Sequence, residues 1–150
     1  MTPQLNPTNP HENIELRLRT MRTLWTGMIL SIAGYFVLTL FAGRSENIEP
    51  NPTLSLILLG VAVSAALLSF PLKNKLLNRA VEQRQVPLVQ QAYIVAWAIT
   101  EVGGLLGVLD FFMTGNRYYY LLFMIAALGQ LLHFPRREHV LNAWAKSPIF

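Results

Sequence analysis

The chain contains no cysteine and carries little charge. None of its 150 residues is cysteine, which excludes disulfides, thiol catalysis, iron–sulfur clusters and cysteine-type zinc sites. Only 13% of the residues are charged, whereas about a quarter are charged in a typical soluble domain. The hydrophobic residues make up 53% and gather into long segments, so the composition predicts an integral membrane protein.

Four apolar segments follow a proline-containing N-terminal stretch. We expect residues 1–22 to form a disordered or basic cytoplasmic N-terminal segment, with a disordered tail over about 1–13 and a helical, basic pattern from about 14 to 22. The apolar segments lie at about 23–42, 53–70, 88–113 and 118–134, each near the length that crosses ~30 Å of hydrocarbon as a helix. A backbone in lipid must satisfy its own hydrogen bonds, so we predict an all-α protein with a four-helix transmembrane domain over residues 23–150.

Lys and Arg residues are distributed unevenly around these segments. Of the 12 Lys and Arg residues, all but two lie before the first segment, between the second and third segments, or after the fourth. The two exceptions are Arg44 and Arg117, which lie in the other two connections. Basic connections stay in the cytoplasm, so this pattern predicts cytoplasmic N- and C-termini in a bacterial inner (cytoplasmic) membrane. The same pattern explains the formal charge of +4 without a nucleic-acid partner.

Two stretches share the pattern F-P-x-[KR]-x-x-x-L-N and begin at Phe70 and Phe134. Each places apolar residues on one helical face, which predicts short interfacial helices after spans two and four. The alternative is that each stretch continues the preceding span. The repetition also favours two repeated helical hairpins of the same orientation, although proline and basic residues end many unrelated spans.

Glu101 is the charged residue nearest the middle of a predicted span. A charge at that depth costs about 2.5–3.5 kcal/mol on insertion scales, so we expect Glu101 to be protonated or hydrogen-bonded and to face other helices. Ser31, Tyr35 and Ser64 are polar residues at matching depth. Together they form a candidate ion or proton site. The alternative is a structural role, in which a protonated carboxyl group holds helices together.

Two further polar residues lie near the ends of predicted spans. Asp110 is near the outer end of the third span, where we expect water to solvate it. His133 is at the inner end of the fourth, where we expect an interfacial anchor.

Small residues form a stripe along the third span. Gly103 and Gly107 make a G-x-x-x-G pair, and Ala96 extends it. Small residues let two helix backbones approach closely, so this face is predicted to pack on another helix. The partner helix belongs either to the same chain or to a dimer.

Part of the third span resembles a known family. The residues concerned are Arg84-Gln85-Val86-Pro87, Ala98-Ile99-Thr100-Glu101 and Gly104-Leu105-Leu106-Gly107. This stretch resembles the second helix of rotary ATPase proteolipid (c-type) subunits. The resemblance implies a cytoplasmic loop before the helix and a proton or sodium ion bound by Glu101. The family has a glycine-rich ridge on the preceding helix, which residues 53–70 lack.

The whole chain resembles small uncharacterised four-span bacterial membrane proteins. These have a comparable Glu-containing third span and a later F-P-R-R-E sequence, here Phe134 to Glu138. This resemblance implies a location and a fold, and it implies no activity.

No residue set typical of catalysis accompanies these features. The sequence has no phosphate-binding loop, Ser/His/Asp set, paired metal-binding carboxylates or midspan histidine pair for haem. We therefore expect no enzymatic activity, no cofactor and no metal. The favoured interpretation is a small non-enzymatic accessory or structural membrane subunit, in a homodimer or a larger membrane complex. The alternative is proton or cation translocation through Glu101.

Overall fold

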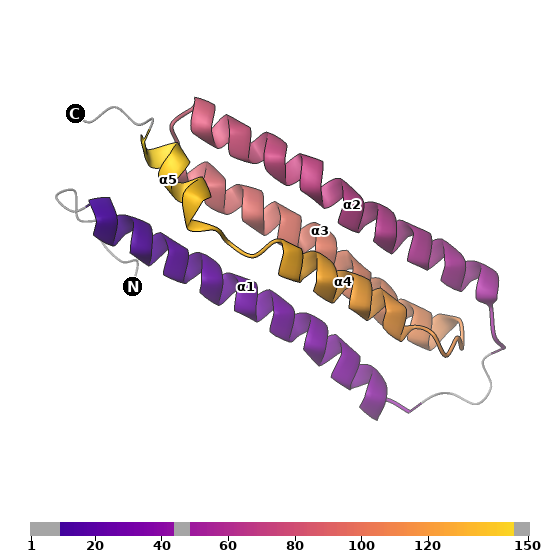
Figure 1. Ribbon diagram of the computed structural model, residues 1–150. Helices are drawn as coiled ribbons and strands as arrows, with labels where there is room; N and C mark the ends of the chain where they lie inside the picture. The colour runs from indigo at the N-terminus through magenta and orange to yellow at the C-terminus, as the bar shows by residue number, and fades with distance from the viewer. Residues whose placement is uncertain (1–9, 44–48, 146–150) are drawn as a thin grey trace.

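The computed structural model describes residues 10–43 and 49–145, and these form five α-helices and no strands (Figure 1). The helices are α1 (Pro10–Phe41), α2 (Pro52–Glu82), α3 (Val86–Met113), α4 (Tyr120–Leu132) and α5 (Arg137–Ala145). The predicted all-α fold is confirmed. Three helices, α1, α2 and α3, are long and apolar enough to cross a membrane. The fourth span stays a prediction, because α4 has only 13 residues.

Helix α3 is the centre of the bundle and contacts each of the other four helices. Helices α1 and α2 lie on opposite sides of it and make no contact with each other within the described residues (Figure 1). The predicted hairpin of spans one and two is therefore wrong. The helix that packs most extensively on α3 is α2, which precedes it directly in the chain.

A tight turn joins α2 to α3. The amide of Gln85 donates to Ala80 O at 3.0 Å and that of Arg84 donates to Val81 O at 3.4 Å, the two bonds of a Schellman motif. Arg84 occupies the left-handed position of this motif with φ 55°. Glycine usually fills that position, so the hairpin forms at a small conformational cost.

Helix α2 is one continuous helix of 31 residues, and Pro71 lies inside it. The expected separate interfacial helix after span two is therefore wrong, and the stretch continues the span. Ser69, Lys73, Leu77 and Ala80 are buried at helical spacing on both sides of Pro71. Packing along this face offsets the one hydrogen bond that proline removes. After α4, in contrast, Pro135 separates the helix from a short α5, as predicted.

The start of α1 also differs from expectation. The helix begins at Pro10, within the segment expected to be disordered, and residues 1–9 lie outside the described part of the chain. Ile14, Leu18 and Met21 recur at helical spacing and are each no more than 2% exposed. They pack in one core cluster with Val140 and Ala143 of α5. The apolar stripe thus extends the helix well before the first apolar segment.

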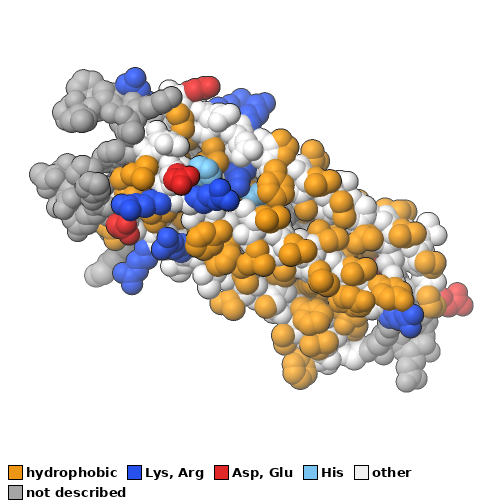
Figure 2. All heavy atoms as spheres, viewed as in Figure 1, with side chains coloured by type: hydrophobic (Ala, Val, Ile, Leu, Met, Phe, Trp, Pro, Cys, Tyr) orange, Lys and Arg blue, Asp and Glu red, His pale blue; other side chains and the backbone are white. Residues whose placement is uncertain are grey.

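The charged side chains gather at one end of the bundle. Figure 2 shows most of the Lys and Arg side chains on the visible face at the end that holds the start of α1, the end of α2 and α5. Hydrophobic side chains cover most of the remaining length. We call this the basic end. Its assignment to the cytoplasm stays a prediction.

A glycine-to-alanine pair tests the packing of α3 against α4. A Cβ atom at Gly129 would lie 2.9 Å from Thr100 Cγ2 and 3.3 Å from Thr100 Cβ, too close to the helix backbone to move away cheaply. We expect Gly129→Ala to lower the free energy of unfolding by about 1–3 kcal/mol, measured by tryptophan fluorescence in detergent.

The matched control is Gly60→Ala in α2, where a Cβ atom would meet nothing within 4 Å. Alanine favours helix over glycine by about 1 kcal/mol, so this variant should be as stable as the parent or more so. Equal effects of the two substitutions would contradict the close approach of α3 and α4.

Candidate functional site

Glu101 lies near the middle of α3 and pairs with two hydroxyl groups of α1. Ser31 Oγ is hydrogen-bonded to Glu101 Oε1, and the Tyr35 hydroxyl lies 3.3 Å from the same oxygen. Ser31 and Tyr35 are four residues apart, so they share one face of α1. We call these three residues the Glu101 cluster. All three are half-buried between α1 and α3.

The Glu101 cluster has hydrogen-bond partners for both protonation states of the carboxyl group. Ser31 Oγ also lies 2.9 Å from Met28 O, but a serine hydroxyl has a single proton to donate. When Ser31 donates to Glu101, the carboxylate accepts bonds from both Ser31 and Tyr35. When Ser31 donates to Met28 O, a protonated Glu101 donates to Ser31 Oγ. A proton can therefore be added or removed while α1 and α3 stay in place.

Ser64 does not join this cluster. It is exposed on α2, which packs on a different side of α3 from α1. Matching residues by depth identifies the level of a side chain in the bundle, but it does not identify which side of α3 that side chain reaches.

The small residues of α3 pack against α4. Ala96, Gly103 and Gly107 are buried. A Cβ atom at Gly103 would lie 3.2 Å from Ala126 Cβ, and one at Gly107 would lie 2.8 Å from the Phe123 ring. This face is predicted to pack either on a helix of the same chain or on a dimer partner. In the structure Gly103 and Gly107 contact α4 of the same chain.

Asp110 is buried, contrary to the expectation that water solvates it. It is 1% exposed, with Ser55 Oγ 3.0 Å from its Oδ2 and Thr114 Oγ1 2.6 Å from its Oδ1. Asn116 Nδ2 donates to Ser55 Oγ at 2.6 Å. We call these four residues the Asp110 cluster. The first turn of α2 and the turn after α3 supply these hydrogen-bond partners, and the hydrophobic pattern of the sequence predicts neither contact.

A third polar cluster lies toward the basic end. Lys73 is 8% exposed, and its Nζ lies 3.0 Å from His133 Nδ1, while His133 Nε2 lies 2.6 Å from Ser69 Oγ. We call these three residues the Lys73 cluster. His133 is fully buried, so it is not the interfacial anchor that we expected.

The donors of the Lys73 cluster run in one direction. An ammonium group has donors only, so His133 Nδ1 accepts from a charged Lys73, and Nε2 carries the proton donated to Ser69. Ser69 Oγ in turn donates to Ala66 O at 2.6 Å. While Lys73 is charged, His133 therefore cannot take the Ser69 proton, which is the step that a serine–histidine nucleophile requires; with a neutral Lys73 the other tautomer lets Nε2 accept from Ser69.

Sequence reasoning missed Lys73 and Ser69. Lysine on a segment that reads as amphipathic is normally taken as part of a solvated face, and Ser69 lies in an uncharged run. Their spacing of four residues places them on one face of α2. Leu77 and Ala80 continue that face at helical spacing and are buried. Their apolar side chains are the one feature of the sequence that predicts burial of this face.

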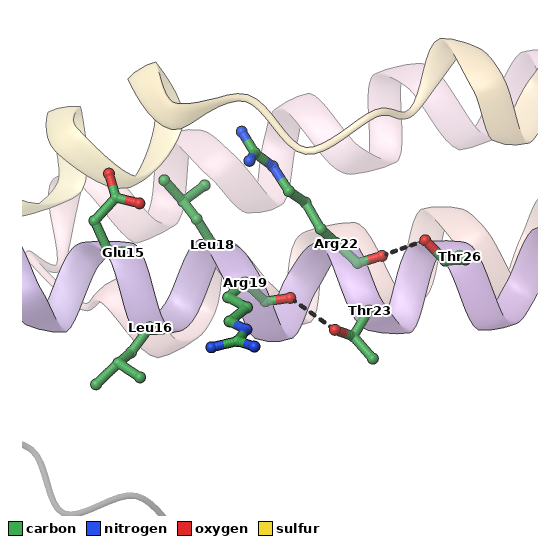
Figure 3. Close-up of a pocket in the computed structure, with 7 residues that line it drawn as sticks. All are labelled: Glu15, Leu16, Leu18, Arg19, Arg22, Thr23 and Thr26. Carbon is green, nitrogen blue, oxygen red and sulfur yellow. Dashed lines mark hydrogen bonds between the residues drawn. The ribbon is translucent and has the colours of Figure 1, made fainter.

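A hollow of about 570 Å³ runs along the first turns of α1 (Figure 3). All of its lining residues belong to α1, and Thr23 and Thr26 donate to carbonyls of that same helix, those of Arg19 and Arg22. The Arg22 guanidinium lies 5.9 Å from the centre of the Phe134 ring. Because one helix forms the whole lining, the hollow is a surface groove without converging polar groups.

Comparisons with known protein families, with curated proteins and with solved structures found no match to this chain. Within the described residues no group of three or more His, Asp or Glu side chains is placed to hold a metal ion. The candidate chemistry of the molecule therefore rests on the Glu101, Asp110 and Lys73 clusters.

The contact of α5 with α3 predicts a dependence on pH. The Tyr93 hydroxyl lies 2.6 Å from His139 Nδ1 and accepts the amide of Arg136 at 3.1 Å. Burial, with the positive charges of Lys73 and Arg136, lowers the pKa of His139 below its ordinary 6.5. The neutral imidazole is thus favoured by folding, and the stability that it contributes is present above pH 6.5 and is lost as the pH falls below that value.

We therefore expect α5 to detach at acidic pH, measured as faster trypsin cleavage after Arg136 and Arg137. The increase should be smaller in the His139→Gln variant, because that variant has no imidazole to protonate at this contact. An equal increase in both proteins would contradict the role of His139.

Proposed function

We propose that the protein is a small non-enzymatic accessory or structural subunit of a bacterial inner membrane, with four spans and cytoplasmic N- and C-termini. The clustering of Lys and Arg at the basic end supports this orientation, because basic segments stay on the cytoplasmic side. While Lys73 is charged, the hydrogen bonds of Ser69, His133 and Lys73 provide no serine–histidine nucleophile, which supports a non-enzymatic role.

A buried connection after α4 supports this helix as the fourth span. Its 13 residues rise only about 20 Å at ~1.5 Å per residue. His133 and Pro135, which follow the helix, are fully buried, and His133 O accepts a hydrogen bond from Trp97 Nε1 at 3.0 Å. Non-helical backbone is tolerated at membrane depth where protein covers it, so this connection can extend the span beyond the end of α4.

We further propose that Glu101 binds a proton reversibly in the middle of the membrane. The observation that carries this proposal is the Glu101 cluster, in which two α1 hydroxyls meet one carboxyl oxygen. Within the described residues the one salt bridge joins Arg137 and Glu15 at the surface, so no basic side chain neutralises Glu101. A carboxyl group that is costly to ionise, yet has partners in both states, suits reversible protonation.

An apolar groove supports the accessory role. It lies between α1 and α4 and has a volume of about 410 Å³. Its lining residues are Ile29, Ile32, Ala33, Phe36, Tyr120, Phe123, Met124 and Ala127. In a membrane such a groove accepts side chains of a neighbouring helix, either from a second copy in a homodimer or from another subunit of a larger complex.

Carbodiimide labelling tests the proposed proton site. A hydrophobic carbodiimide reacts with a protonated carboxyl group in an apolar environment, so Glu101 should be labelled at neutral pH in membranes. Glu101→Gln should abolish the label at this position. Tyr35→Phe removes one of the two α1 hydroxyls that contact Glu101 Oε1, so the pH profile of labelling should change.

Asp110→Asn is the matched control, since it removes the other buried carboxylate of α3 and leaves the Glu101 cluster unchanged. Labelling of Glu101 should persist in this variant. If Glu101 is unreactive across the pH range, or if Tyr35→Phe leaves the pH profile unchanged, the proposed proton site is wrong.

A further inference from the structure

The end of the bundle opposite the basic end contains a hollow with a charged floor. It has a volume of about 330 Å³ and lies between the first turns of α2 and α4. Leu56 and Leu59 of α2 and Leu121 of α4 line its sides. Ser55, Asp110, Asn116 and Tyr118 supply its polar lining. The volume is at the lower end of the ~300–1,000 Å³ typical of small-molecule sites, and an apolar wall with a few convergent polar groups is typical of them.

Asp110 in this hollow is held as a hydrogen-bond acceptor. Ser55 Oγ accepts the amide proton of Asn116 Nδ2, and Asp110 Oδ2 is the acceptor within reach of its own proton at 3.0 Å. Thr114 Oγ1 accepts the backbone amide of Asn116 at 3.2 Å, and its single proton has two acceptors within reach, Asp110 Oδ1 at 2.6 Å and Asp110 O at 2.8 Å. Each carboxylate oxygen thus meets one hydroxyl. A carboxylate has about four lone-pair sites, so acceptor capacity remains.

No basic side chain of the described residues is paired with Asp110. The nearest basic residue along the chain, Arg117, is bonded to the Tyr118 hydroxyl at 2.6 Å, and its guanidinium lies 4.8 Å from the centre of the Tyr118 ring. Arg117 itself does not line the hollow, but Tyr118 does, so the guanidinium lies beside the hollow and is bonded to Tyr118 and not to Asp110. A buried carboxylate without a basic partner is stabilised by a cation that brings its own donors.

We infer that this hollow binds an ammonium group carried on an apolar body. The ammonium donates to Asp110 Oδ2, and the apolar body lies along Leu56, Leu59 and Leu121. This site differs from the Glu101 cluster, because it faces α2 and not α1 and has a hollow beside the carboxylate. The ammonium comes either from a free amphiphilic amine or from the headgroup of a phosphatidylethanolamine lipid.

The experiment compares three eight-carbon probes on the full chain in nanodiscs of phosphatidylcholine: octylammonium, octanol and octanoate. Octylammonium should bind and raise the melting temperature, and the other two should bind at least roughly ten-fold more weakly, the difference expected for one hydrogen bond to a charged group. Asp110→Asn should remove the preference for octylammonium. Glu101→Gln should keep it, so failure of this inference is distinct from failure of the proposed proton site.

A second variant keeps the test decisive if Asp110→Asn fails to fold. Leu59→Trp fills the hollow and leaves Asp110 in place, so it should also weaken octylammonium binding roughly ten-fold or more. Equal binding of the three probes, or unchanged octylammonium binding in Leu59→Trp, would overturn the inference.

A further measurement with phosphatidylethanolamine distinguishes the two sources of the ammonium group, a lipid headgroup and a free amine. In nanodiscs that contain phosphatidylethanolamine, native mass spectrometry should detect this lipid retained by the parent protein and lost in Asp110→Asn if the headgroup is the ligand. If octylammonium still binds with unchanged affinity in these nanodiscs, the ligand is a free amine. If neither the lipid is retained nor the amine binds, the hollow has no ammonium site.

Discussion

The structure depends on the burial of α3 among the other helices. Of the three candidate spans, α3 has 44% of its most apolar window buried, against 11% for α1 and 17% for α2. In the part of the chain that the structure describes, α1 and α2 each contact α3 and the shorter α4 and make no contact with each other, so these two central helices position the outer ones. Its glycines allow α4 to approach closely, and its polar residues fix which neighbour lies on which side. Without α3 the remaining helices have few shared surfaces.

Polar pairing gives each side of α3 a different neighbour. Glu101 meets hydroxyls of α1, Asp110 meets Ser55 of α2, and Thr100 Oγ1 lies 2.7 Å from Gln130 Oε1 of α4. In a bilayer, apolar contacts distinguish poorly between helices, because lipid chains are equally apolar. Hydrogen bonds at three positions therefore specify the arrangement. The same bonds place the two carboxyl groups in different surroundings, since Glu101 is half-buried beside α1 and Asp110 is fully buried beside α2.

Much of this arrangement could be predicted from the sequence, and the failures have one physical cause. Depth along a span brought Ser31 and Tyr35 to the level of Glu101, and the bounds of α3 agree closely with the predicted third span. The depth of a residue along a span does not say which side of α3 it faces. Depth alone therefore groups Ser64 with Ser31 and Tyr35, although Ser64 is exposed on α2. The burial of Asp110 and Lys73 arises from long-range contacts, and local charge patterns read such residues as solvated.

The central claim is that α1 docks on α3 at the level of Glu101, and a disulfide cross-link tests it most directly. A Cβ atom at Gly104 would lie 3.6 Å from Ile32 Cγ1, and the chain has no cysteine of its own. With a protease site inserted between α1 and α2, the double variant Ile32→Cys and Gly104→Cys should hold both fragments together in oxidised membranes. The pair Gly34→Cys and Gly104→Cys should not, because a Cβ atom at Gly34 of α1 would meet nothing within 4 Å. Fragments that separate in the first variant, or stay joined equally in both, would contradict the docking of α1 on α3.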